Sequence, residues 1–187
     1  MSGTTGRNLL RGIARIARFR PDGLADIGDD AGAVATSLIP LAVLPLAGSL
    51  IALMNGAGWY ALRDLFIVAC ALLAPLVVTH ALARAWGREA VWPRFAAAFN
   101  WCQWAIPVAA MGLLLGAAVL VMFGLPTELS GLLVLLGVLV YALSLHWFVA
   151  RHALRLSGAM AALLVVLTNL GTLACLAVPR LIAGALG

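Results

Sequence analysis

Five long apolar segments dominate this sequence and restrict what it can fold into. They cover residues 31–54, 65–83, 95–123, 131–150 and 159–178, and the connections between them are short. A bilayer core about 30 Å thick requires roughly 20 apolar residues of helix, so each segment is long enough to cross it. The strand-like alternation that a membrane β-barrel repeats along its sequence is not seen. We therefore predict an all-α, polytopic membrane protein with a bundle of five transmembrane helices.

The low content of charged residues supports the same class of protein. Apolar residues make up 64% of the chain and charged residues only 10%, whereas a soluble domain usually carries about 25% charged residues. A water-soluble globular protein is therefore strongly disfavoured. Cys70, Cys102 and Cys175 lie within apolar runs and lack the CxxC or CxxH spacing of a metal site, so the sequence predicts neither a metal centre nor a disulfide framework.

The arginines are distributed unevenly over the connections. All twelve basic residues are arginine: five lie in the N-terminal tail, three in the connection 84–94 and two in the connection 151–158, which leaves only Arg63 and Arg180 for the other side. Basic residues concentrate in cytoplasmic loops. We therefore predict a protein of the bacterial inner membrane with its N-terminus in the cytoplasm and its C-terminus in the periplasm.

The N-terminal tail, residues 1–30, is predicted to be distinct from the transmembrane domain, residues 31–187. Its arginines follow one another in steps of four, four and three residues, which places them on one helical face: Arg7, Arg11, Arg15 and Arg18. Apolar residues fall on another face: Leu9, Ile13, Ile16 and Ala17. Such a basic amphipathic helix is expected to lie on the anionic cytoplasmic leaflet. The alternative is a disordered tail that only enforces the topology.

Small residues recur at four-residue spacing in three of the predicted helices. Gly48, Ala52 and Gly56 follow this spacing in the first helix, Gly112 and Gly116 in the third, and Gly171 and Cys175 in the fifth. Small residues allow helix backbones to approach closely in lipid. We expect these stripes to pack helices within one chain, with self-association as the alternative.

Polar side chains from three helices are predicted to lie at one depth. His80 comes four residues before Arg84, His146 five before Arg151, and Asn100 and Gln103 about two turns into the third helix. At 1.5 Å per residue, these four side chains should lie roughly 6–14 Å inside the cytoplasmic interface. Asn169 of the fifth helix lies deeper, near the midplane. Polar groups are costly within a membrane and by default call for a functional hypothesis.

Four interpretations of this polar layer remain open. The side chains could form a structural network of hydrogen bonds with one another and with backbone carbonyls exposed by Pro75 and Pro107. They could bind a quinone, a lipid headgroup or a partner helix. His80 and His146 could ligate a haem, which only their matched depth supports. A proton or ion path is the fourth interpretation, although no Asp or Glu occurs within any span. No cofactor is required by the sequence, and quinone and haem are the two candidates.

Two short motifs resemble a known group of proteins. Phe99-Asn100-Trp101 opens the third helix, and Trp147-Phe148-Val149-Ala150-Arg151 closes the fourth. Together with the five spans, these motifs resemble five-span inner-membrane proteins of proteobacteria that are loosely grouped with the Yip family. The resemblance implies a non-enzymatic membrane protein that binds partners or shapes its bilayer, and it supplies no catalytic residues.

The sequence favours a non-enzymatic function. None of the motifs GxSxG, HExxH, P-loop or GxGxxG in a strand-to-helix context is found. We expect a scaffold or accessory subunit that binds other membrane proteins or a second copy of itself, together with anionic lipid, and that has no nucleic-acid partner. The alternative is a redox-linked subunit or small carrier that binds a quinone or haem at the polar layer.

Overall fold

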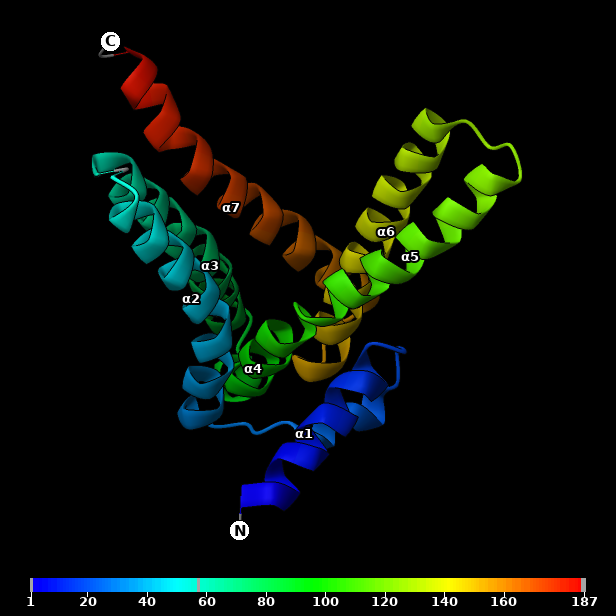
Figure 1. The fold of residues 1–187 in the computed structure, drawn as a ribbon. Helices are drawn as coiled ribbons and strands as arrows, with labels where there is room; N and C mark the ends of the chain where they lie inside the picture. The colour runs from blue at the N-terminus through cyan, green and yellow to red at the C-terminus, as the bar shows by residue number, and fades with distance from the viewer. Residues whose placement is uncertain (1, 57, 186–187) are drawn as a thin grey trace.

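The computed structural model describes residues 2–56 and 58–185, and the described part of the chain is helical without strands (Figure 1). The elements are α1 (Ser2–Ile16), the 3₁₀ turn η1 (Pro21–Asp26), α2 (Ala31–Met54), α3 (Trp59–Ala85), the 3₁₀ turn η2 (Glu89–Val91), α4 (Trp92–Cys102), α5 (Ala105–Met122), α6 (Thr127–Ala153) and α7 (Gly158–Ala185). Five segments within the described residues are long and apolar enough to cross a membrane, namely α2, α3, α4 with α5, α6 and α7. The predicted all-α membrane fold is therefore confirmed.

The third apolar segment is divided into two helices. Instead of one helix over residues 95–123, α4 ends at Cys102 and α5 begins at Ala105. The backbone N–H groups of Gln103 and Trp104 bond to carbonyls three residues earlier, as in a 3₁₀ turn. Proline has no N–H group, so Pro107 cannot continue the helical ladder back to the carbonyl of Gln103. The break therefore falls at Gln103, whose carbonyl receives no hydrogen bond from residue 107.

The short helix α4 forms the centre of the molecule. Its residues from Phe95 to Asn100 are all buried, and the side chains of Ala96, Ala97 and Ala98 are fully enclosed. α2 packs on one side of α4 and α6 on another. Three consecutive alanines present small side chains in every direction, which lets several helices approach one short segment closely.

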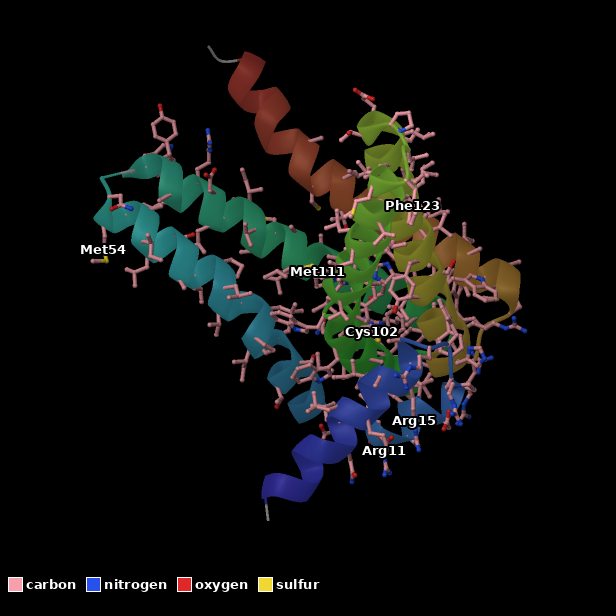
Figure 2. The ribbon with its side chains drawn as sticks, turned by 45° about the vertical axis from the view of Figure 1, so that its right-hand side comes forward. Arg11, Arg15, Met54, Cys102, Met111 and Phe123 are labelled. Carbon is pink, nitrogen blue, oxygen red and sulfur yellow. The ribbon has the colours of Figure 1, made fainter. Side chains whose placement is uncertain are left out.

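The remaining helices form two arms that diverge from α4. α2 and α3 make one arm, and α5 and α6 make the other, while α7 begins beside α6 and crosses to pack along α3 (Figure 1). Met54 and Phe123 lie at the outer ends of the two arms in Figure 2. The core is therefore concentrated where α4 meets its neighbours, and the arms expose wide apolar surfaces beyond it.

The amphipathic helix predicted for the N-terminal tail is α1, and it packs against the end of the bundle. Ile16 is fully buried, and the Tyr141 hydroxyl of α6 donates a 2.9 Å hydrogen bond to the carbonyl of Ala17. Phe19 contacts the rings of Tyr141 and Phe148 edge to face, with centroids 5.9 and 5.6 Å apart. The apolar face of α1 is thus covered in part by protein, and the tail is joined to the transmembrane helices.

Candidate functional site: an intramembrane polar cavity

Three of the five predicted ligand-binding residues line one cavity between α3, α4, α6 and α7. This cavity has a volume of about 160 Å³. Its polar lining consists of Gln103, His146, Thr168, Asn169 and Thr172. Its apolar lining consists of Pro75, Phe95, Phe99, Leu164 and Val165. The structure therefore brings Gln103, His146 and Asn169 together, and it places Asn100 and His80 elsewhere.

Gln103 and His146 face each other across the cavity wall. The Nε2 atoms of the two side chains are 3.4 Å apart, and the imidazole ring lies against Phe99 with ring centroids 4.6 Å apart. The break between α4 and α5 positions Gln103, because that residue occupies the turn between the two helices. A side chain in this turn can point toward α6 and α7 from the centre of the bundle.

The polar residues of α7 differ in whether their side chains form hydrogen bonds within the described structure. Asn169 Nδ2 donates to the carbonyl of Val165 at 2.8 Å, and the Thr172 hydroxyl donates to the carbonyl of Thr168 at 2.8 Å. The Thr168 hydroxyl is buried and has no hydrogen-bond partner among the described residues. From the sequence, Asn169 of this helix was selected, but neither Thr168 nor Thr172. Their four-residue spacing, which puts both hydroxyls on one face of α7, could have identified them from the sequence.

Asn100 forms a structural contact on the opposite side of α4. Its Nδ2 donates a 2.9 Å hydrogen bond to the Ser37 hydroxyl of α2, which in turn donates to the carbonyl of Val34 at 2.7 Å. Asn100 is 2% exposed and Ser37 is fully buried. The amide therefore joins α4 to α2. Ser37 was missed at the level of sequence, because one serine near the start of a long apolar helix does not reveal its partner.

His80 has an environment separate from that of His146. Its Nε2 lies 3.5 Å from Glu89 Oε1, and its ring contacts Trp92 edge to face at 4.7 Å. It lines an open apolar pocket on the outer side of α3, together with Arg84 and Trp92. His80 and His146 therefore line different pockets, although the sequence predicts a similar depth for both.

The predicted lipid-facing arginines divide into two groups. Arg15 forms ion pairs with Asp22 at 3.5 Å and Asp26 at 3.2 Å, and it thereby fastens α1 to η1. Arg11 and Arg18 are exposed and make no ion pair with any described residue. Figure 2 shows Arg11 and Arg15 on α1, at the end of the molecule from which the arms diverge. The side chain of Arg7 lies outside the described residues.

Other arginines extend this basic surface. Arg84, Arg88, Arg151 and Arg155 are exposed, and within the described ranges none of them is paired with a carboxylate. The guanidinium of Arg151 lies over the ring of Trp147, with its Cζ 5.2 Å from the ring centroid. Arg84 and Arg151 lie in the last turns of α3 and α6, and Arg88 and Arg155 follow them. These helix ends lie at the same end of the molecule as α1 (Figure 1). We call Arg11, Arg18, Arg84, Arg88, Arg151 and Arg155 the basic end.

The fold and these surfaces define an integral membrane protein with five spanning segments and an arginine-rich end. Models of known protein families, curated protein sequences and solved structures contain no match to this chain.

Proposed function

We propose that the protein is a scaffold or accessory subunit of the bacterial inner membrane. In this proposal, the α5–α6 arm binds a transmembrane helix of a partner, which is another membrane protein or a second copy of this chain. The basic end contacts anionic lipid of the cytoplasmic leaflet. In this orientation the N-terminus lies in the cytoplasm and the C-terminus in the periplasm. The activity is binding, and no catalytic residue is assigned.

The observation that carries this proposal is the isolation of the α5–α6 arm. α5 packs along α6 and touches α4 only near the break, and the arm diverges from α2 and α3 (Figure 1). Met111 of α5 is 59% exposed and Phe123, just beyond its end, is 84% exposed. An arm with only two helices leaves most of its surface to be covered by lipid or by another protein.

The small residues of α5 favour contact with a partner helix over contact with lipid. A Cβ atom added to Gly112 or Gly116 would meet nothing within 4 Å in the described part of the chain. These glycines also line a groove of about 400 Å³ between α5 and α6, together with Ala117 and Val134. Glycines in lipid gain stabilisation when a second helix backbone approaches them closely, whereas mobile lipid tails cannot pack as densely. The α5 stripe therefore supports binding of a helix from outside this chain.

The stripe on α7 is used differently. A Cβ atom at Gly171 would lie only 2.9 Å from Val78 Cγ2 of α3, so this glycine serves packing within the chain. The expectation that small residues pack helices of one chain holds for Gly171. It does not hold for Gly48, Gly112 and Gly116, where an added Cβ atom would meet no described atom within 4 Å.

The basic end supports the proposed lipid contact and orientation. Six exposed arginines without ion pairs to described residues gather at one end, whereas Arg63, near the start of α3, is paired with Asp64 at 3.1 Å. Each basic residue near an anionic membrane surface contributes about 1 kcal/mol of attraction. The asymmetry also follows the concentration of basic residues on the cytoplasmic side of membrane proteins.

Co-purification from native membranes in a mild detergent tests the proposal. We expect the tagged wild-type chain to be recovered with a stoichiometric membrane partner or as a defined oligomer. Replacing both Gly112 and Gly116 with Ile should abolish this association, because the branched side chains keep the partner backbone away. Gly48→Ile in α2 is the matched control, since Gly48 also faces open space in the described structure. Recovery of the wild-type chain alone, or equal loss in the control, would contradict the proposal.

A further inference from the structure

The cavity next to His146 has a lining suited to an uncharged polar ligand. Its polar residues are Gln103, His146, Thr168, Asn169 and Thr172, and its described lining contains no Asp, Glu, Arg or Lys. A charged ligand would be desolvated there without a counter-charge, which is strongly unfavourable. A neutral molecule with hydrogen-bonding atoms would be accepted.

The Gln103–His146 pair leaves both a donor and an acceptor for such a ligand. If the Gln103 amide N–H donates to His146 Nε2, then Nδ1 carries the proton and remains a donor, while Gln103 Oε1 remains an acceptor. If the amide is turned the other way, Nδ1 remains an acceptor and the amide N–H₂ a donor. Either arrangement offers one donor and one acceptor to a ligand in the cavity.

Thr168 adds a third polar group that can form a hydrogen bond with the ligand. It is 5% exposed, it lines the cavity, and its hydroxyl has no hydrogen-bond partner in the described part of the structure. Thr172, one turn further along α7, satisfies its hydroxyl by donating to a backbone carbonyl. A buried hydroxyl without a partner is unfavourable, so an oxygen of a bound molecule is the natural complement of Thr168.

Size and wall composition favour a ring over water alone. The cavity volume of about 160 Å³ is several times the share of about 30 Å³ that one water molecule takes in the liquid. Phe95, Phe99 and Leu164 supply flat and apolar walls, on which an aromatic or quinonoid ring can pack. Water molecules would find few polar partners along these walls.

A second groove gives the ligand's tail a route to lipid. Val165 and Asn169 line both the cavity and a neighbouring groove of about 460 Å³ between α6 and α7. The groove also includes Val166 and Leu170, which are 54% and 57% exposed on the outer surface of α7. A hydrocarbon tail leaving the cavity past Val165 would therefore reach the bilayer interior.

We infer that this cavity binds a lipid-soluble molecule with an uncharged ring head that carries carbonyl or hydroxyl oxygens, which is the chemistry of a quinone. The oxygens of the ring contact Thr168 and the Gln103–His146 pair, the ring packs against Phe99, and the tail follows the groove between α6 and α7. This inference concerns binding and does not depend on the partner helix proposed for the α5–α6 arm.

Photolabelling of the full chain in nanodiscs of neutral phospholipid tests the inference. The probe is an azidoquinone, competed with decylubiquinone, and labelled peptides are identified by mass spectrometry. We expect saturable labelling within α6 or α7 that decylubiquinone displaces. Thr168→Val keeps the shape of the side chain, and we expect it to weaken displacement about tenfold, as for one lost hydrogen bond to the ligand. Gln103→Leu should have a similar effect.

His80→Leu is the matched control, because His80 lies outside the cavity at a similar depth along its helix. We expect this variant to bind like the wild-type chain, and we expect Thr168→Val to have an unchanged thermal unfolding midpoint. Labelling that does not saturate, that is equal in Thr168→Val and wild type, or that falls equally in His80→Leu would overturn the inference. A cavity that holds only water would give the first of these results.

Discussion

Asn100 of α4 and Ser37 of α2 are joined by a buried hydrogen bond, although 63 residues separate them in sequence. The Asn100 amide donates to the Ser37 hydroxyl, which donates onward to the carbonyl of Val34. Both side chains are almost completely excluded from solvent. This chain of hydrogen bonds connects the α2–α3 arm to the central helix at a place where the packing is otherwise apolar.

The first prediction concerns the strength of this link. Ser37→Ala leaves the Asn100 amide unpaired, and Asn100→Leu leaves the Ser37 hydroxyl with only its bond to Val34. We expect each variant to lower the free energy of unfolding by about 0.6–2 kcal/mol, the range of interhelical hydrogen bonds in membranes. Equilibrium unfolding in mixed micelles measures this change. In a double-mutant cycle the two losses should not add, whereas Ser144→Ala, on α6, should be near neutral.

The second prediction concerns the close approach of α1 and η1. A Cβ atom at Gly23 would lie 2.6 Å from the Gly12 carbonyl oxygen and 2.9 Å from Ile16 Cγ1. Gly23→Ala should therefore separate the two elements, at a cost of about 1–3 kcal/mol for overpacking. We expect trypsin to cleave after Arg11 or Arg15 faster in this variant than in wild type. Gly131→Ala, at a site with open space around it, is the control, and equal cleavage rates in the two variants would contradict the prediction.

Position in the sequence predicts the depth of a residue along its helix, but not the direction in which its side chain points. Helical rise relates position in the sequence to depth, so His80 and His146 could be assigned to one layer. The face on which each side chain lies depends on how helices cross, and these crossings place His80 beside Trp92 and His146 beside Phe99. The class of fold followed from the length of the apolar segments and from their lack of strand-like alternation, because only helices and closed barrels satisfy the backbone in lipid.

Helix packing was harder to predict for a related reason. Glycine spacing marks where a helix can be approached but does not identify the approaching helix. A Cβ atom at Gly171 would meet Val78 of α3, whereas one at Gly112 would meet no atom within 4 Å in the described chain. The crossing at Ala96–Ala98 was not predicted, because alanines are common in apolar helices and the break at Gln103 that positions α4 depends on Pro107 and on the helices around it.

The third prediction concerns the lipid preference of the basic end. Arg11→Gln with Arg18→Gln removes two exposed charges that have no ion pair with the described residues. At about 1 kcal/mol each, their loss should reduce the enrichment of phosphatidylglycerol over phosphatidylcholine around the protein by about fivefold per residue. Native mass spectrometry of retained lipids measures this enrichment. Arg63→Gln, near the start of α3, is the control, and an equal reduction there would show that the effect is not specific to this end.

The fourth prediction compares backbone strain with side-chain packing at Phe19, which lies in the turn after α1. Its φ of 58° lies in the left-handed region, which costs a residue with a Cβ atom roughly 1–2 kcal/mol relative to glycine. The ring offsets this cost by packing edge to face against Tyr141 and Phe148. Phe19→Ala loses the packing and keeps the strain, whereas Phe19→Gly loses both. We therefore expect Phe19→Gly to be the less destabilising of the two by about 1 kcal/mol. Unfolding in mixed micelles compares them directly, and a glycine variant less stable than the alanine variant would show that the turn is not strained.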